Sequence, residues 1–340
     1  MTPAAGITAF TVEDADERDL RGCHRVMLAR QLTDRPDEPR LGYESCVGRL
    51  RTPFPGFGPV RHWAARVDGE VVGLATVHFA EAANSHLGLT DVVVHPESRR
   101  RGIGTALLRA LLPDLRARHR TAVEGWQVTR GGDGEAWASA LGFRTVYTSL
   151  LQSLPVPEVD PDLWDVEDPP GYRLERWRGA SPEHLLPSYL GARAAIHDVP
   201  VDDLGVPSPR WTAELVRHHE ADLRGRGVEL LGVVAVHEES GAVVGVTEIE
   251  VHPHRPHLPF QRDTAVVAAH RGRGLGRWMK ADMIHWLLDD FPDVEGVHTA
   301  TGAENTHMSR VNLSLGFTTV RTMLAVRRGV GELESALAAG

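Results

Sequence analysis

The sequence predicts a mixed α/β fold made of two copies of one unit. A short apolar strand, a turn rich in arginine and glycine, and an apolar helix occur in this order at residues 89–108 and again at 261–280. A Leu-Gly-Phe tripeptide follows each stretch, at 141–143 and at 315–317. Predicted strands and helices also follow the same order on both sides of a proline-rich segment. A tandem duplication of one α/β unit accounts for all three observations.

The two copies align without a gap across the turn. Asp91 matches Asp263 and Arg99 matches Arg271, and both pairs lie 172 positions apart (263 − 91 and 271 − 99). The Leu-Gly-Phe tripeptides lie 174 positions apart (315 − 141), so only two residues of slippage separate the turn from the tripeptide.

Composition sets the class of protein. The chain has 340 residues, enough for two domains that each bury a core. Its hydrophobic fraction of 42% and charged fraction of 24% are typical of a soluble globular protein. A formal charge of −9 argues against nucleic acid as a partner and mildly favours a cationic substrate. The sequence shows neither a signal peptide nor an apolar run that would span a membrane, so we expect a cytoplasmic protein.

The first half begins with a strand and a helix at 16–32, and a short helix at 43–50 follows a loop broken by prolines. The turn Asp68-Gly69 predicts a hairpin. The helix at 102–119 has leucines at three- and four-residue steps, so one face is buried. A short helix at 135–141 ends at Gly142. The strands expected in this half are 7–12, 62–67, 70–79, 89–95, 121–128 and 143–154.

Residues 155–170 hold five prolines among acidic residues and are predicted to form a fairly stiff linker. We therefore expect an N-terminal domain at 1–154 and a C-terminal domain at 171–340. The second half repeats the cycle, with a hairpin turn at Ser240-Gly241. Its expected helices, besides the one that follows the glycine turn, are 182–197, 211–226, 305–315 and 332–338. Its expected strands are 172–177, 230–237, 243–251, 264–268, 294–301 and 317–327.

The turn rich in arginine and glycine has the composition of an anion-binding loop. Backbone N–H groups at a helix start are unpaired and carry the positive end of the helix dipole. Glycines at 272, 274 and 276 let the main chain close around a phosphate, and the neighbouring arginines add forked donors. The spacing matches neither a Walker loop nor a dinucleotide fingerprint. An ordinary strand-to-helix turn is the alternative for each copy.

The order of strand, Arg-x-x-Gly-x-Gly turn, apolar helix, strand, short helix and Leu-Gly-Phe resembles the GCN5-related N-acetyltransferase superfamily in its tandem bacterial form. The motif stands at 99–104 and at 271–276. The resemblance implies two domains, each a mostly antiparallel central sheet with a splayed pair of parallel strands flanked by helices. It also implies acetyl-CoA as the cofactor, with its pyrophosphate in the turn and its pantetheine arm along the splayed strand.

The resemblance assigns cofactor binding to matching positions in both halves. In the first half these are Val92, Val93, Val94, Arg99, Arg100, Arg101, Gly102, Ile103, Gly104 and Thr105. In the second half they are Thr264, Ala265, Val266, Arg271, Gly272, Arg273, Gly274, Leu275, Gly276, Arg277 and Asn305. Asn305 also stands in a good N-cap position for the helix that it starts.

The general base cannot be carried over from the family. Several relatives have a glutamate eleven residues before the first arginine of the turn, where neither copy here has an acid. Asp263 is the duplicated acid of the second motif strand, and Glu248 and Glu250 share one face of the adjacent strand. Asp263 and Glu248 are the predicted catalytic carboxylates. Their alternative roles are to cap a strand end or to pair with Arg262.

The general acid is a second departure from the family. Relatives commonly place a tyrosine four residues before the glycine of Leu-Gly-Phe, where this chain has Ala138 and Asn312. Asn312, the third predicted catalytic residue, can hydrogen-bond the sulfur of CoA but cannot supply a proton. Trp137 stands where the resemblance implies a slimmer residue, and no asparagine of the first half matches Asn305. We therefore predict catalysis in the second half.

Two other groups of residues fit special chemistry poorly. Cys23 and Cys46 are open to a disulfide or a nucleophilic role, but buried reduced thiols are favoured. The histidines of residues 252–257 lie among prolines, and no carboxylate or cysteine cluster completes a metal site, so a surface loop is expected.

The sequence thus predicts an acetyl-CoA-dependent N-acetyltransferase that acts by direct transfer to a primary amine in a ternary complex. The acceptor, a small molecule or a peptide, is not readable, and we expect a monomer or a homodimer. A non-catalytic CoA-binding sensor and a transferase of larger acyl groups are the alternatives.

Overall fold

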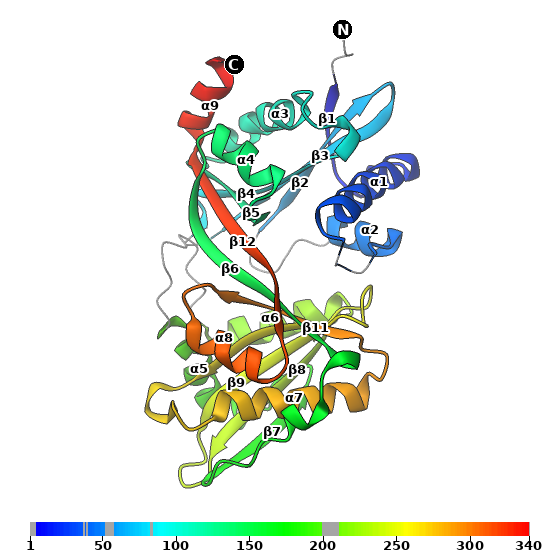
Figure 1. The fold of residues 1–340 in the computed structure, drawn as a ribbon. Coiled ribbons are helices and arrows are strands. Elements are labelled where there is room, and N and C mark those ends of the chain that lie inside the picture. The colour runs from blue at the N-terminus through cyan, green and yellow to red at the C-terminus, as the bar shows by residue number, and fades with distance from the viewer. Residues whose placement is uncertain are drawn as a thin grey trace. The chain divides into compact units, whose positions relative to one another are not determined.

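The computed structural model describes residues 5–36, 38, 40–51, 58–81, 84–198 and 211–339. These residues form two compact units with the predicted mixed α/β character (Figure 1). Unit 1 comprises the described residues up to Tyr147 and those from Met323 onward. Unit 2 comprises the described residues from Thr148 to Thr322.

The sheet of unit 1 has the strand order β1-β2-β3-β4-β5-β12. Its neighbours are antiparallel except for the parallel pair β4 and β5. Helices α1 and α2 cover one face, and α3 and α9 cover the other. The strands are β1 (Gly6–Phe10), β2 (Val60–Val67), β3 (Glu70–Phe79), β4 (Leu87–Val94), β5 (Ala122–Thr129) and β12 (Thr318–Gly329). The helices are α1 (Glu17–Asp34), α2 (Tyr43–Arg51), α3 (Ile103–Ala117), α4 (Asp133–Ala140) and α9 (Val330–Ala339).

The sheet of unit 2 repeats this plan with the strand order β6-β11-β10-β9-β8-β7. Its parallel pair is β10 and β11, and α7 covers one face while α5 and α6 cover the other. The strands are β6 (Arg144–Pro155), β7 (Tyr172–Arg178), β8 (Glu229–His237), β9 (Val243–Val251), β10 (Phe260–Val266) and β11 (Gly296–Gly302). The helices are α5 (Leu186–Ala194), α6 (Ala213–Gly225), α7 (Leu275–Asp290) and α8 (Thr306–Ser314).

The two halves of the sequence exchange their last strands. Residues 149–155 of β6, from the first half, pair with β11 in unit 2, and residues 323–329 of β12 pair with β5 in unit 1. Each exchanged strand is twelve residues long. Neither contains a proline before its last residue, so no proline interrupts either strand. The compact units therefore divide near 147 and 322, whereas the predicted boundary at 155–170 divides the two copies in sequence.

Residues 155–170 pack onto unit 2. They contain the short 3-10 helices η3 (Val156–Glu158) and η4 (Pro161–Trp164). Trp164 is buried in the core under α7, and its Nε1 donates a hydrogen bond to the carbonyl oxygen of Leu315 at 3.0 Å. This segment is therefore part of the hydrophobic core of unit 2.

Cys23 and Cys46 are buried between α1 and α2, as predicted. Burial raises the pKa of each thiol to about 12, which keeps both protonated and unreactive.

No helix among the described residues is long and apolar enough to cross a membrane. Within the same ranges, no group of three or more His, Cys, Asp or Glu residues is placed to hold a metal ion.

Candidate active site

The glycine turn of unit 2 leads from β10 through the 3-10 helix η6 (Ala268–His270) into α7. Gly274 caps the helix with φ +80°, a left-handed conformation that favours glycine. A side chain at Gly276, in the first turn of α7, would meet nothing within 4 Å. The first N–H groups of α7 therefore lie at an open surface where an anion can approach. Arg271 donates from Nε to the carbonyl oxygen of Val266 at 2.9 Å, which closes the turn.

The glycine turn of unit 1 has the same path but is covered at Gly104, in the first turn of α3. A Cβ at Gly104 would lie 3.2 Å from the Trp137 ring, which comes from α4. Arg100 adopts φ +61° where unit 2 has Gly272, a conformation that is strained for a residue with a Cβ. Arg99 bonds Asp34 at 2.6 Å and Asp133 at 3.2 Å, so its guanidinium is engaged within the protein. The ring and the ion pairs restrict access to this turn.

The parallel strand pair opens in both units, as the resemblance implied. Strands β10 and β11 pair only at Phe260↔His298 and Gln261↔Thr299, and β4 and β5 pair only from Leu87↔Ala122 to Thr90↔Gly125. The predicted pantetheine-binding backbones, 264–266 and 92–94, lie beyond the last pair. In the registers above, the backbone of 264–266 is therefore not paired with β11, and the backbone of 92–94 is not paired with β5.

The motif strand of unit 2 carries a β-bulge that unit 1 lacks. Between Gln261 and Thr264, β10 advances by three residues while β9 moves only from Ile249 to Thr247. The matching strands of unit 1, β4 and β3, keep one register from Gly88 to Val94. A bulge adds a residue on one strand and re-aims its side chain, and bulges are frequent beside active sites. Here it falls at Arg262 and Asp263.

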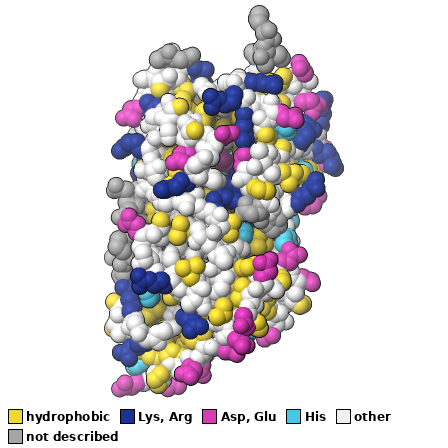
Figure 2. All heavy atoms as spheres, in the orientation of Figure 1, with side chains coloured by type: hydrophobic (Ala, Val, Ile, Leu, Met, Phe, Trp, Pro, Cys, Tyr) yellow, Lys and Arg dark blue, Asp and Glu magenta, His cyan; other side chains and the backbone are white. Residues whose placement is uncertain are grey.

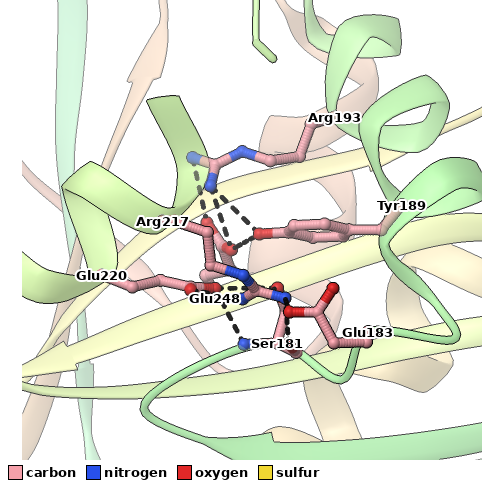
Figure 3. A network of polar contacts seen from close by, with 7 residues as sticks. All are labelled: Ser181, Glu183, Tyr189, Arg193, Arg217, Glu220 and Glu248. Carbon is pink, nitrogen blue, oxygen red and sulfur yellow. Dashed lines mark hydrogen bonds and ion pairs between the residues drawn. The ribbon is translucent and has the colours of Figure 1, made fainter. Parts of the chain in front are cut away.

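Glu248 and Asp263 converge on one guanidinium. Arg193 of α5 lies 3.3 Å from Glu248 (Nη2–Oε2) and 3.7 Å from Asp263 (Nη2–Oδ2), and its guanidinium stacks 3.7 Å from the Trp211 ring centroid. Tyr189, one turn earlier on α5, donates its hydroxyl to Glu248 and accepts a hydrogen bond from Arg193 at 3.0 Å (Figure 3). The predicted pair of carboxylates is thus brought together by a cation.

The two carboxylates differ in their environment. Glu248 is 2% exposed, and burial raises its pKa even though Arg193 and the Tyr189 hydroxyl lower it. Asp263 is 46% exposed at the bulge and has Arg193 on one side only. Glu248 therefore suits a buried anchor, whereas Asp263 can reach a water or an amine.

Burial and charge act together on the other members of this cluster. Burial and the charge of Glu248 raise the pKa of Tyr189 well above its ordinary value. Burial alone would lower the pKa of Arg193, but the charge of Glu248 raises it overall, so the guanidinium stays charged.

Glu250, on the same strand, is tied differently. Its carboxylate lies 3.1 Å from His252 and 3.2 Å from Arg262. Burial alone would raise its pKa, but the hydrogen bond with His252 and the charge of Arg262 lower it to about 2. Pairing with Arg262, the alternative for the acids of this strand, is thus confirmed for Glu250.

A second polar group in Figure 3 fixes the approach to α5. Glu220 of α6 accepts hydrogen bonds from the backbone and the hydroxyl of Ser181, both at 2.8 Å. Arg217 pairs with Glu220 and with Glu183. These contacts hold the segment before α5 against α6 and so help to place Tyr189 and Arg193.

Asn312 lies apart from this cluster. Its side chain is fully buried and donates to Gln152 of β6 at 2.8 Å and to Thr301 of β11 at 3.2 Å. Both amide hydrogens are thus engaged within the protein. Asn305 is the N-cap of α8, as predicted, and accepts a hydrogen bond from the backbone of Met308 at 3.1 Å.

Tyr189, Arg193 and Trp211 were not predicted from the sequence as site residues. A signal for the first two was present, because residues four apart in a predicted helix share one face. Nothing in the sequence indicated that this face would meet Glu248.

Comparisons with known proteins find similar proteins over most of this chain. The model of the acetyltransferase (GNAT) family matches residues 30–143 and 195–317, which is more than half of the chain. A mycothiol acetyltransferase from Nocardia farcinica is 29% identical over 76% of this chain and 80% of its own length. One from Mycobacterium avium is 29% identical over 68% of this chain and 71% of its own.

Solved structures show the tandem arrangement. A tandem GNAT protein from the clavulanic acid biosynthesis pathway has a TM-score of 0.78 and 26% identity, and covers 96% of this chain and 99% of its own. A GCN5-related N-acetyltransferase from Sphaerobacter thermophilus has a TM-score of 0.72 at 17% identity, over 95% of this chain and 96% of its own. The second likeness concerns the fold alone.

Proposed function

The chain belongs to the acetyltransferase (GNAT) family, and from this premise we propose that unit 2 transfers an acetyl group from acetyl-CoA to a primary amine of a small acceptor. Bound acetyl-CoA would supply the thioester carbon that the amine attacks. One observation carries the proposal. Only unit 2 combines a first helical turn that is open at its glycine, Gly276, with a bulged motif strand whose acid lies near a cation.

The residues of the turn fit the cofactor. The N–H groups at the start of α7 face open space at Gly276, and Gly272 and Gly274 place no Cβ near the main chain. Arg273 and Arg277 add positive charge to the turn. The unpaired edge of 264–266 offers backbone groups to the pantetheine arm and to the thioester carbonyl. Asn305 is proposed to contact the same arm from the N-terminus of α8.

Asp263 is the proposed general base. It is half-exposed and would accept the proton of the attacking amine directly or through one water. Arg193 holds it in place, and Glu248 with Tyr189 holds Arg193. Asn312 is proposed to support the site by fixing α8 against β11 rather than by donating to the leaving sulfur. The thiolate would then take its proton from water or from the ammonium product.

In unit 1 the corresponding positions, listed above from Val92 to Thr105, are proposed to have a reduced or absent role in binding acetyl-CoA. Trp137 over Gly104 and the ion pairs of Arg99 are the reasons.

Two variants at Gly276 that differ in charge but not in size test the cofactor site. Gly276→Asp places a carboxylate where the pyrophosphate is proposed to lie, and Gly276→Asn is its neutral match in size. Aspartate in the first turn of a helix is favourable for the helix itself, so the folded state should be retained. We expect calorimetry to show at least tenfold weaker acetyl-CoA binding for Gly276→Asp than for Gly276→Asn. Equal affinities would contradict the proposed cofactor site.

A panel of amines tests turnover. It contains the acceptor of the mycothiol acetyltransferases, polyamines, aminoglycosides and peptides with a free N-terminus. We expect acetyl transfer to at least one amine, and loss of this activity in Asp263→Asn. Acetyl-CoA binding without turnover on the whole panel would favour the sensor alternative.

A further inference from the structure

The β-bulge of β10 places two neighbouring side chains of opposite charge on one face of the sheet. On either side of the bulge, Gln261 and Thr264 are each hydrogen-bonded to the hydroxyl of Thr247 at 2.7 Å, so both lie on the face of Thr247. Arg262 and Asp263 stand between them in the bulge. Adjacent residues of a regular strand point to opposite faces, whereas the extra residue of a bulge lets two of them share one face.

The contacts of Arg262 and Asp263 place both on the other face, which is the one toward α5. Arg262 lies 3.2 Å from Glu250 (Nε–Oε1). Asp263 lies 3.7 Å from Arg193 (Oδ2–Nη2), and Arg193 pairs with Glu248. Strand β9 carries these two glutamates on the face opposite to its single threonine, because successive side chains of a strand alternate. The bulge therefore presents a cation and an anion side by side.

Each of these two charges is held from behind and open in front. The side chain of Arg262 is 44% exposed and that of Asp263 is 46% exposed, whereas their partners Glu250 and Arg193 are buried. The ring of Phe260 lies beside the guanidinium of Arg262, with its centroid 5.6 Å from Cζ. Within the described ranges, Arg262 and Asp263 form no ion pair with each other, and no hydrogen bond engages the Nη groups of Arg262. A ligand can therefore reach both charges.

Unit 1 has the acid of this pair but not the arginine. Asp91 matches Asp263, and the residue that matches Arg262 is Thr90 (262 − 172). Thr90 is 8% exposed, and its hydroxyl donates to the carbonyl oxygen of Gly88 at 3.3 Å. Strand β4 has no bulge, so the residue before the acid points to the opposite face. The paired charges therefore belong only to the unit for which we propose catalysis.

We propose that the acceptor of unit 2 is a small amine that also carries a carboxylate, such as an amino acid, with its amine at Asp263 and its carboxylate on Arg262. This inference rests on the proposed function, because it names the acceptor of the same site. A guanidinium binds a carboxylate through paired N–H donors. Because the negative charges of Glu250 and Asp263 lie close to Arg262, a singly charged carboxylate fits better than a doubly charged phosphate.

The two charges of such an acceptor match the two charges at the bulge. An amine without a carboxylate would leave the outer side of Arg262 to solvent and would gain nothing from it. Figure 2 shows acidic and basic side chains interspersed over the face that it draws, which favours selection by local contacts over selection by net charge.

Calorimetric titration of the full-length protein with glycine, β-alanine and γ-aminobutyrate, each compared with its own amide, tests the carboxylate contact. We expect at least one amino acid to bind at least fivefold more tightly than its amide, and Arg262→Gln to remove this preference. Arg262→Met is a second variant with the same expectation, and it decides the test if Arg262→Gln does not fold. Arg224→Gln, which removes an exposed arginine of α6, is the matched control and should change the preference less than twofold.

An acetyl-transfer assay with the same pairs separates this inference from the proposed function. A preference for the amino acid in kcat/KM that is lost with Arg262 supports both. A preference in binding without any acetyl transfer would contradict the transferase and still support the carboxylate contact. Acetylation of amino acid and amide with less than a fivefold difference in kcat/KM would overturn the inference and leave the transferase intact. Absence of saturable binding for all three amino acids, or a preference that persists in the folded Arg262 variant, would also overturn it.

Discussion

Lys280 gives unit 2 a pH-dependent stability that can be assigned to one side chain. It is the only lysine of the chain, is 1% exposed in α7, and has its Nζ 5.0 Å from the centroid of the Phe317 ring. Burial lowers the pKa of its ammonium from 10.5 to about 7. Leu108 is the buried residue at the matched position of α3 in unit 1, so the repeat accommodates an apolar side chain there.

The sign of the effect follows from proton binding. Below about pH 7 the ammonium is protonated in both states, whereas between about 7 and 10.5 only the unfolded chain keeps the proton. The free energy of unfolding therefore rises with pH across this window, by about 1.4 kcal/mol per pH unit and about 5 kcal/mol in all. The contact with Phe317 offsets about 1 kcal/mol of the cost. We expect Lys280→Met to be about 3–4 kcal/mol more stable than the wild type at pH 6, with the difference close to zero at pH 10.

Urea denaturation at pH 6, 8 and 10 measures this difference. Leu108→Met is the matched control, because it changes the same helix position without a titrating group and should shift stability equally at all three pH values. The single lysine also gives one side-chain resonance in a protein labelled with ¹⁵N at the Nζ of lysine, and we expect it to titrate near pH 7. A lysine that titrates near pH 10, or a stability difference that is the same at pH 6 and pH 10, would refute the reasoning.

Three further predictions concern the site and its support. Arg193→Met removes the cation between the two carboxylates, so we expect kcat for acetyl transfer to fall at least tenfold. Arg193→Lys should recover part of this loss. An unchanged kcat in the methionine variant would argue against the role of Arg193. Trp137→Ala uncovers the turn of unit 1, and we expect the acetyl-CoA stoichiometry measured by calorimetry to rise from one toward two, whereas a constant value of one would show that the ring is not what closes that turn. Trp164→Ala leaves a cavity beneath α7 and should lower the free energy of unfolding by about 3–5 kcal/mol in urea; a loss below about 1 kcal/mol would mean that residues 155–170 behave as the linker predicted from sequence.

The repeat made much of the fold readable from the sequence. Local signals placed the glycine turns, the hairpins and the final helix, because each depends on residues close together in the chain. The N-cap at Asn305 and the left-handed Gly142 belong to this class. The alignment of the two copies also predicted that Asp91 and Asp263 would lie on equivalent strands, and the structure places both on motif strands.

The features that the sequence did not indicate depend on partners far apart in the chain. Residues 155–170 have the composition of a linker, yet Trp164 enters a core formed by side chains more than a hundred positions away. Arg193 has ordinary neighbours in a predicted helix, and only the packing of α5 on the sheet brings it to Glu248 and Asp263. Asn312 was predicted to be catalytic because it stands where the resemblance implies a tyrosine, and its hydrogen bonds to β6 and β11 could not be read from that position.

The exchange of strands makes the sheet of each unit depend on both halves of the sequence. Unit 1 takes β12 from the end of the chain, and unit 2 takes residues 149–155 of β6 from the first half. Without these strands, β5 and β11 would each expose a row of unpaired backbone groups. Neither half of the sequence therefore contains a complete sheet. We therefore expect neither half of the sequence to fold into a stable unit when it is produced alone.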